Sequence, residues 1–399
     1  MRWRLAIAVA AVALGGTAHG QEKKPEVSFE EKLLATVPEG VKGDEFSFSS
    51  DGRTVAYAAH RGEPGKDARY RVTVGDHQGE EFDAARYLIA SPVGSHFAYV
   101  AAKGRKLFIV VGDKKGEEFD NVEYPAFSSD GTVVAYWAIT GQGREARRSM
   151  VVGDRKGPPM EGAPGSLAFG VLFSYPVFRP NTDVVAYTAQ EGGKCFIVLG
   201  DKRGEAFDEV TAPEFSRDGS TMAYAAATGK EGARKWFVVV GDQRGEQFDF
   251  VSHIAFSPDG KTVAYGAREG KKWFVVVGDK RGREFSDLDI LANPIFSPDG
   301  RAVAYAISKN GKSCVVVGER EGEQFFQVFP SAFSPDGSKV ACLAMNPGKW
   351  FVVAGETHSE ALDNVDPRSS GPYFSPDGSK VAYGAMKGRE LWWKVMAVK

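Results

Sequence analysis

Hydrophobic and polar residues alternate in short runs along most of the chain, and these runs recur in a fixed order. The stretch FSPDGKTVAYGA, at Phe256 to Ala267, shows an aromatic residue, a Pro-Asp-Gly turn signal and an apolar run. A Gly/Lys loop, an aromatic-aliphatic run such as KWFVVVGD and a charged stretch ending in residues like GEQFD follow in most copies. Runs rich in Val, Phe, Tyr and Trp between turn signals are typical of strands. Each unit therefore predicts four short strands, here called A to D.

The turn between strands A and B contains Asp-Gly in most copies, which predicts a two-residue hairpin with both residues in the left-handed region. We expect these aspartates to serve the turn conformation and not to act as ligands.

The unit is repeated through the chain in steps of mostly about 40 residues. Its anchor appears as FSSDG, FRPNT, FSRDG, FSPDG or, in one degenerate copy, ASPVG, starting at Phe48, Ala90, Phe127, Phe178, Phe215, Phe256, Phe296, Phe333 and Phe374. Four strands every 40 residues predict a blade of a β-propeller. The predicted fold is all-β, a single closed propeller of nine four-stranded blades; eight is the alternative if the copy at Ala90 merges with a neighbour.

The last unit ends at ELWWKVMAVK and lacks a fourth strand. We expect residues near Phe29 to Val37 to supply that strand and to close the ring, because closure removes an exposed sheet edge. Phe29 to Ala35 is also the one stretch that could instead form a helix of more than two turns.

Alanine occupies the middle of strand B in every copy, which a close approach of neighbouring blades would require. These positions are Ala56, Ala98, Ala135, Ala186, Ala223, Ala264, Ala304, Ala341 and Ala382.

The phrase SPDG followed by VAY resembles the WD40-like repeat called PD40, which occurs in the TolB propeller and in prolyl-oligopeptidase-type propellers. The resemblance covers residues 44–399. It implies a TolB-like propeller and suggests protein partners in the cell envelope. The Gly-His and Trp-Asp pairs of true WD40 repeats, the N-terminal domain of TolB and the hydrolase domain of the peptidases are missing.

The first 20 residues are typical of a cleavable signal peptide, with Arg2 and Arg4 before the apolar run Leu5 to Leu14. We therefore expect a periplasmic or extracellular protein with a short N-terminal segment over residues 21–43. No later stretch is long and apolar enough to predict a membrane span. Arg155 to Pro176 interrupts the repeat and reads as a surface excursion, either a loop that contacts a ligand or a neutral insertion.

The sequence lacks the common motifs of catalytic and metal-binding sites. There is no G-x-S-x-G, no H-E-x-x-H and no calcium loop, so we predict no catalytic residue, metal or other cofactor. Three cysteines predict no disulfide framework. A net charge of −2 argues against nucleic-acid binding.

The loops between strands B and C carry a formal charge of +14, against −2 for the whole chain. In a four-stranded meander these loops share one face with the D–A connections, so we expect a basic loop face. Its candidate binding residues are Arg61, Lys106, Arg147, Arg148, Lys230, Lys235, Lys271 and Lys272. The alternative is that these lysines only keep the loops soluble.

The sequence as a whole predicts an exported binding or scaffold protein, monomeric, which contacts an envelope or secreted protein, an acidic one included, or an anionic glycan through the basic face. The alternative is a propeller-type glycan-processing enzyme of the lyase kind. Its site would lie at the channel mouth, near His253, Asn293 and Arg368. A sensor for a small anion is a third hypothesis.

Overall fold

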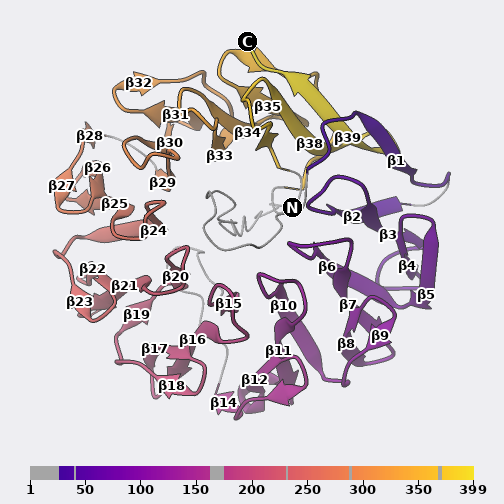
Figure 1. Cartoon of the computed structure of the whole chain (residues 1–399). Helices are drawn as coiled ribbons and strands as arrows, with labels where there is room; N and C mark the ends of the chain where they lie inside the picture. Colours follow the sequence, from indigo (N-terminus) through magenta and orange to yellow (C-terminus); the bar gives the residue numbers. More distant parts are fainter. Residues whose placement is uncertain (1–26, 40–41, 162–174, 231, 287–289, 367–370) are drawn as a thin grey trace.

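Nine sheets stand as blades around a central axis in the computed structural model (Figure 1), which describes residues 27–39, 42–161, 175–230, 232–286, 290–366 and 371–399. Four strands form the main path of every sheet, each antiparallel to the next. The predicted nine-bladed propeller is confirmed, and the degenerate copy at Ala90 forms a blade of its own. Residues 1–20, expected to be a signal peptide, and most of the Arg155–Pro176 interruption lie outside the described residues.

The strands of the first four blades follow in chain order from the channel outwards. They are β2 (Lys42–Phe48), β3 (Val55–Arg61), β4 (Arg69–Val74) and β5 (His77–Phe82); β6 (Ala84–Ala90), β7 (Phe97–Lys103), β8 (Lys106–Val111) and β9 (Lys114–Lys115); β10 (Asn121–Phe127), β11 (Val134–Thr140), β12 (Arg147–Val152) and β13 (Arg155–Lys156), with β14 (Met160–Glu161) beside β12; and β15 (Val177–Phe178), β16 (Val185–Glu191), β17 (Lys194–Leu199) and β18 (Lys202–Arg203). A 3₁₀ turn, η1, spans Gly143–Glu145.

Blades five to nine repeat this order, and the ninth takes its outer strand from the start of the chain. They are β19 (Glu209–Val210) and β20 (Glu214–Phe215) as a divided inner strand, β21 (Met222–Thr228), β22 (Lys235–Val240) and β23 (Gln243–Arg244); β24 (Phe250–Phe256), β25 (Val263–Glu269), β26 (Lys272–Val277) and β27 (Lys280–Arg281), with β28 (Phe285–Ser286); β29 (Ile290–Phe296), β30 (Val303–Lys309), β31 (Lys312–Val317) and β32 (Arg320–Glu321); β33 (Gln327–Phe333), β34 (Val340–Asn346), β35 (Lys349–Ala354) and β36 (Thr357–His358); and β37 (Tyr373–Phe374), β38 (Lys380–Lys387), β39 (Glu390–Ala397) and β1 (Lys32–Thr36).

The A–B turn differs from the predicted hairpin. In the sixth blade the N–H of Gly260 donates to the carbonyl of Ser257 at 2.9 Å, so Pro258 and Asp259 are the central residues. Only Gly260 has a positive φ, at 71°. Proline in the second and glycine in the fourth position are typical of a type I turn. The Asp259 carboxylate accepts hydrogen bonds from the Ser257 hydroxyl (2.6 Å) and the Lys261 N–H (3.1 Å), which agrees with its expected conformational role.

The core consists of separate hydrophobic clusters between neighbouring blades. One cluster joins Ala223 and Val238 of blade five to Ile254 and Phe274 of blade six. All nine repeated alanines are completely buried, as the pattern predicted. The three cysteines are buried and free.

The buried alanines set the spacing between blades. We expect Ala223→Leu to lower the free energy of unfolding by about 1–3 kcal/mol, because the added methyl groups have no space between two packed sheets. Urea unfolding measures this loss. Ala233→Leu, in an exposed loop of the same blade, is the control; equal stability of the two variants would contradict tight packing at the repeated alanine.

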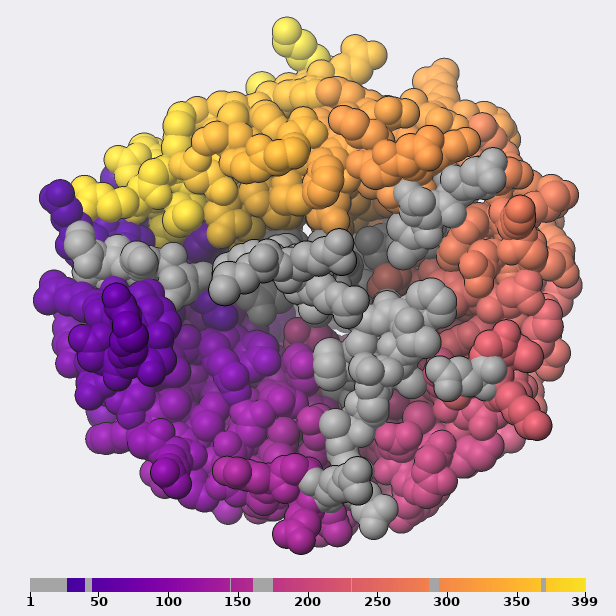
Figure 2. Space-filling view, turned by 180° about the vertical axis from the view of Figure 1, so that it is seen from behind, coloured from indigo at the N-terminus to yellow at the C-terminus, as the bar shows by residue number. Residues whose placement is uncertain are grey.

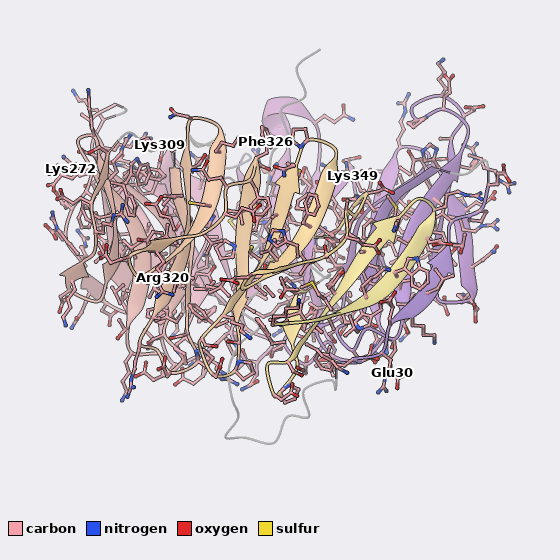
Figure 3. All side chains as sticks on the ribbon, turned by 90° about the horizontal axis from the view of Figure 1, so that it is seen from above. Glu30, Lys272, Lys309, Arg320, Phe326 and Lys349 are labelled. Carbon is pink, nitrogen blue, oxygen red and sulfur yellow. The ribbon has the colours of Figure 1, made fainter. Side chains whose placement is uncertain are left out.

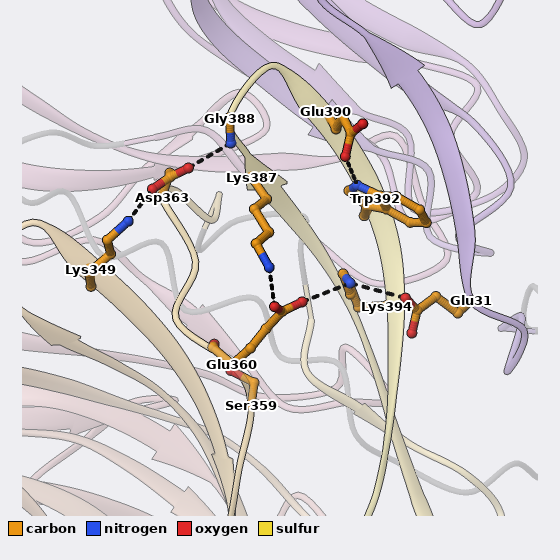
Figure 4. Close-up of polar contacts among 10 residues, drawn as sticks. All are labelled: Glu31, Lys349, Ser359, Glu360, Asp363, Lys387, Gly388, Glu390, Trp392 and Lys394. Atoms are coloured by element: carbon orange, nitrogen blue, oxygen red, sulfur yellow. Dashed lines mark hydrogen bonds and ion pairs between the residues drawn. The ribbon is translucent and has the colours of Figure 1, made fainter.

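Strand β1 pairs with β39 and closes the ring, as predicted. Lys32 lies opposite Trp393, and Thr36 lies opposite Glu390. The stretch considered as a short helix is therefore extended, since its backbone groups complete the edge of the last sheet. Lys394 reinforces the closure, with its Nζ 3.0 Å from Glu31, the residue just before β1, and 2.8 Å from Glu360 of the preceding blade (Figure 4).

An aspartate in the segment that follows the outer strand holds neighbouring blades together on the face of the B–C loops. The Asp249 carboxylate pairs with Lys235 of its own blade at 2.5 Å and accepts the N–H of Gly270 in the next blade at 2.7 Å. We call this arrangement the aspartate clasp. It recurs at five blade junctions, with Asp83, Asp120, Asp208, Asp249 and Asp363 (Figure 4 shows the last).

Candidate functional site: the channel ring

The innermost strands surround a central channel, and a hollow is visible between the blades in the space-filling view (Figure 2). Aligning the repeats on their anchors places one residue of each inner segment, three before the anchor, at the same level of the channel. We call this set the channel ring: Glu45, Tyr87, Tyr124, Tyr175, Ala212, His253, Asn293, Pro330 and Gly371. Contacts between blades confirm the alignment in the first four blades.

Three tyrosines of consecutive blades form one side of the ring. The ring centroids of Tyr87 and Tyr124 lie 5.6 Å apart, and those of Tyr124 and Tyr175 lie 4.8 Å apart. All three side chains are half-buried. Burial raises the pKa of the Tyr87 and Tyr124 hydroxyls, which therefore stay protonated at neutral pH. The result is a continuous aromatic wall that can also donate hydrogen bonds.

Two of these tyrosines sit in an unusual backbone conformation. Tyr87 and Tyr124 have φ values of 55° and 53°, in the left-handed region that bulky residues rarely adopt. Each lies where the pairing of its strand shifts register, between Arg86 and Ile89 in β6 and between Glu123 and Ala126 in β10. Bulges of this kind re-aim a side chain and are common beside functional sites.

Charged and amide side chains join the tyrosines on the same strands. Arg86 donates to the Asn121 amide oxygen at 2.5 Å, and the Asn121 amide donates to Glu123 at 2.8 Å. Arg148, at the start of β12, completes the chain with its guanidinium 3.3 Å from Glu123. The guanidinium of Arg86 also lies 5.2 Å from the centre of the Tyr87 ring. These bonds fix the polar groups next to the aromatic wall.

Glu45 links the first two blades at the same level. One of its carboxylate oxygens accepts the backbone N–H of Leu88 at 2.8 Å, and Leu88 follows Tyr87 directly. The carboxylate therefore helps to hold the bulge that carries this tyrosine.

Another part of the channel contains two titratable groups without described partners. Glu214 lies on β20, and desolvation raises the pKa of its carboxyl to about 8. His253 lies on β24 of the next blade, where burial lowers the pKa of its imidazole. Its Nδ1 is buried and has no hydrogen-bond partner among the described residues. Both shifts favour the uncharged form of the side chain.

The predicted channel-mouth residues are placed in part. His253 and Asn293 both belong to the channel ring, on the neighbouring inner strands β24 and β29. The side chain of Asn293 and the whole of Arg368 lie outside what the structure describes.

The predicted basic loop face contains more negative charge than the loop count suggested. Side views place the B–C loop residues Lys272, Lys309 and Lys349 at one edge and the C–D residue Arg320 nearer the other (Figure 3). Of the eight candidates, Lys106 and Lys235 belong to aspartate clasps, and Lys272 pairs with Glu284 at 2.6 Å. The charge of +14 counts the B–C loops alone. The D–A connections lie on the same face, and their carboxylates are close to these loops.

The remaining candidates on this face differ from one another. Arg148 pairs with Glu123 beside the tyrosines of the channel ring, and Arg147 donates hydrogen bonds to the carbonyls of Glu145 and Ala146. Arg61, Lys230 and Lys271 are exposed, without an ion pair among the described residues. The eight residues therefore differ in how far a neighbouring carboxylate already compensates their charge.

In the described ranges no group of three or more His, Cys, Asp or Glu side chains could hold a metal ion. No helix in those ranges is long and apolar enough to cross a membrane.

Sequence reasoning missed the tyrosines, although the signal for them was present. Aligning the nine copies three residues before the anchor reads Glu, Tyr, Tyr, Tyr, Ala, His, Asn, Pro, Gly. The position carries a different residue type in most blades, so no motif marks it in a single copy.

Comparison with known proteins finds distant structural likenesses. No protein-family model and no curated protein matches the chain. Similar solved structures include an oligogalacturonate lyase in complex with manganese (13% identity, 73% of this chain and 97% of the other, TM-score 0.36). They also include the β-propeller domain of the Trilobed protease from Pyrococcus furiosus (14%, 72% and 97%, 0.36) and a Pyrococcus horikoshii acylaminoacyl peptidase (13%, 78% and 50%, 0.38). Likenesses at this level concern the fold alone.

Proposed function

We propose that this chain is an exported β-propeller binding protein of the cell envelope, and that it holds a segment of a partner protein against the tyrosine side of the channel ring. The observation that carries the proposal is the row Tyr87, Tyr124 and Tyr175, three tyrosines in contact across consecutive blades.

The composition of the wall supports a protein partner. Tyrosine and arginine are the residue types that most often dominate the binding energy of protein interfaces, especially where they are already held in place. Here the bulges hold Tyr87 and Tyr124, and Arg86 and Arg148 are fixed by Asn121 and Glu123. A pre-ordered surface loses less conformational entropy when a partner binds. Export and resemblance to the PD40 repeats of TolB are the sequence-based parts of the proposal.

The test is a pull-down from envelope extract with wild type and a Tyr124→Asn variant, followed by identification of the captured proteins. Asparagine tolerates the left-handed backbone, so the substitution removes the aromatic ring without straining the bulge. We expect the affinity for a specific partner to fall about 30-fold, as for an interface residue worth about 2 kcal/mol. Tyr124→Phe, which keeps the ring, should retain most of the affinity.

Arg61→Glu on the loop face is the control for general charge effects. Equal capture by wild type, Tyr124→Asn and Tyr124→Phe would refute the channel ring as the binding surface. Loss of capture only with Arg61→Glu would show that the partner binds the loop face.

A second candidate is the glycan-processing enzyme, with its site near His253, Asn293 and Arg368. The observation that favours it is that Glu214 and His253 lie on the contacting inner strands β20 and β24, because a protonated carboxyl and a neutral imidazole can act as general acid and base. Release of reducing ends from acidic polysaccharides by wild type, and its absence in Glu214→Gln, would support an enzyme. No release by wild type would exclude this activity on those substrates.

A further inference from the structure

The junction after the seventh blade is one of those that lack the aspartate clasp on the face of the B–C loops, and it carries a phenylalanine in place of the aspartate. In the clasped blades an aspartate follows the residue that bridges strand C, as Asp249 follows Phe248 opposite Trp236. In the seventh blade Phe325 makes the equivalent bridge to Ser313, and the residue that follows is Phe326. A phenyl group thus stands where five other blades present a carboxylate.

The backbone of this junction remains fixed, with a different hydrogen bond. The N–H of Phe326 donates to the side-chain oxygen of Asn346 in the next blade at 3.1 Å. In the clasp, by contrast, the aspartate side chain accepts an N–H of the next blade. The blades are therefore joined without a carboxylate, which leaves the Phe326 side chain 46% exposed. It is one of three large hydrophobic side chains exposed in the described ranges.

The missing carboxylate leaves lysines unpaired. Lys312 begins strand C, at the position from which Lys106, Lys235 and Lys349 reach their aspartates. It lies directly opposite Lys309 across the hairpin, and both are exposed. Neither has an ion-pair partner among the described residues. Like charges facing each other on neighbouring strands are unfavourable unless a counter-charge is supplied.

The flanking blades show that this charge is local. On one side Lys272 pairs with Glu284 at 2.6 Å, and on the other Lys349 pairs with Asp363. Figure 3 shows Lys309 and Phe326 along the same edge of the molecule, between Lys272 and Lys349. Lys309, Lys312 and Phe326 together are named the blade-seven patch.

We propose that the blade-seven patch docks an acidic peptide segment of a partner protein, with carboxylates on Lys309 and Lys312 and an apolar side chain on Phe326. The carboxylates supply the charge that the aspartate supplies elsewhere, and the apolar side chain covers the exposed phenyl group. This site is separate from the channel ring, so its test does not depend on the proposed function.

The test measures binding of a fluorescent synthetic peptide of alternating aspartate and leucine to the full chain by fluorescence anisotropy. Two further peptides replace leucine with serine or aspartate with asparagine. We expect wild type to bind the Asp/Leu peptide at least about tenfold more tightly than either, and more weakly at 300 mM than at 50 mM salt because screening weakens exposed charge pairs.

Phe326→Asp is the decisive variant, because it restores the residue that five other blades carry and gives Lys312 its usual partner. We expect it to fold as stably as wild type and to lose binding of the peptide about tenfold or more. Lys309→Glu should lose a similar factor. Lys103→Glu is the matched control, since Lys103 faces Lys106 across the hairpin of a clasped blade.

Three results would overturn the proposal. Wild type binds no peptide; the serine peptide binds as well as the leucine peptide; or Lys103→Glu weakens binding as much as Lys309→Glu does. Binding of a sulfated oligosaccharide that Phe326→Asp leaves unchanged, without binding of the peptide, would replace the acidic segment by a polyanionic glycan.

Discussion

Replacing Trp393 with alanine is expected to lower the free energy of unfolding by about 3–5 kcal/mol, the largest effect of a single substitution proposed for this protein. Trp393 is completely buried on β39 at the closure of the ring. Its indole N–H donates to the carbonyl of Ser28 at 2.8 Å, and its ring lies 6.0 Å from those of Phe48 and Tyr373. Removing it leaves a cavity where the ninth blade meets the first and releases the segment before β1.

Trp392 provides a matched control for this prediction. The substitution Trp392→Ala removes the same number of atoms from the same strand. The Trp392 side chain, however, points to the other face of the sheet, is half-buried and donates a hydrogen bond to Glu390 at 2.9 Å. Urea unfolding followed by tryptophan fluorescence and circular dichroism compares the two. If Trp392→Ala destabilises the chain as much as Trp393→Ala, closure does not depend on the buried indole.

Acid is expected to unfold the protein over a narrow range below pH 4. Hydrogen bonds lower the pKa of the turn aspartates, to about 2 for Asp218, Asp336 and Asp377. Pairing with lysine and hydrogen bonds from glycine lower the pKa of the clasp aspartates Asp120, Asp208, Asp249 and Asp363.

The sign of the pH effect follows from these directions. A carboxyl whose pKa is lower in the folded chain than in the unfolded chain, near 3.9, stabilises the fold above that value. The stability is lost as pH falls through the folded pKa. The lowered pKa of His253 acts in the same direction from about pH 6.5 downwards, because the unfolded histidine takes up its proton first.

Thermal unfolding at pH 7, 4 and 2.5 measures the effect. Between pH 7 and 4 the raised pKa of Glu214 adds stability as pH falls and the lowered pKa of His253 removes it, so we expect a small net change in the midpoint, followed by a steep fall below pH 4. Asp249→Asn removes one titrating clasp, so it should be less stable than wild type at pH 7 and approach wild type at pH 2.5. A midpoint that does not fall between pH 4 and 2.5 would show that the repeated carboxylates contribute little.

The repeat predicted the architecture because every copy has the same order of apolar runs and turn residues. Apolar runs between turn signals defined the strands, Ala223 and its equivalents marked the blade contacts, and the absent fourth strand pointed to Phe29–Val37. The turn was less well predicted, since Asp-Gly suggested the two-residue hairpin and the preceding proline decided for a type I turn.

The candidate sites could be predicted less well, because they depend on contacts between different copies. The tyrosine wall needs Tyr87, Tyr124 and Tyr175 side by side, and their bulges leave no motif that a single copy shows. The charge of the loop face was overestimated, because an aspartate 14 residues after its lysine belongs to another segment of the same face. The composition of single segments does not predict the contacts that form where the ring brings different copies together.

The aspartate clasp gives the ring a direction. Each clasp aspartate reaches back to a lysine or, for Asp83, an arginine of its own blade and forward to a glycine of the next, so one surface of a blade meets a different surface of its neighbour. Contacts of this heterologous kind continue until the rotation closes on itself. Here they close on β1, a strand held by β39. A molecule whose β1 has come away presents a free edge that fits β1 of a second copy, and exchange of this strand is the expected route from monomer to dimer.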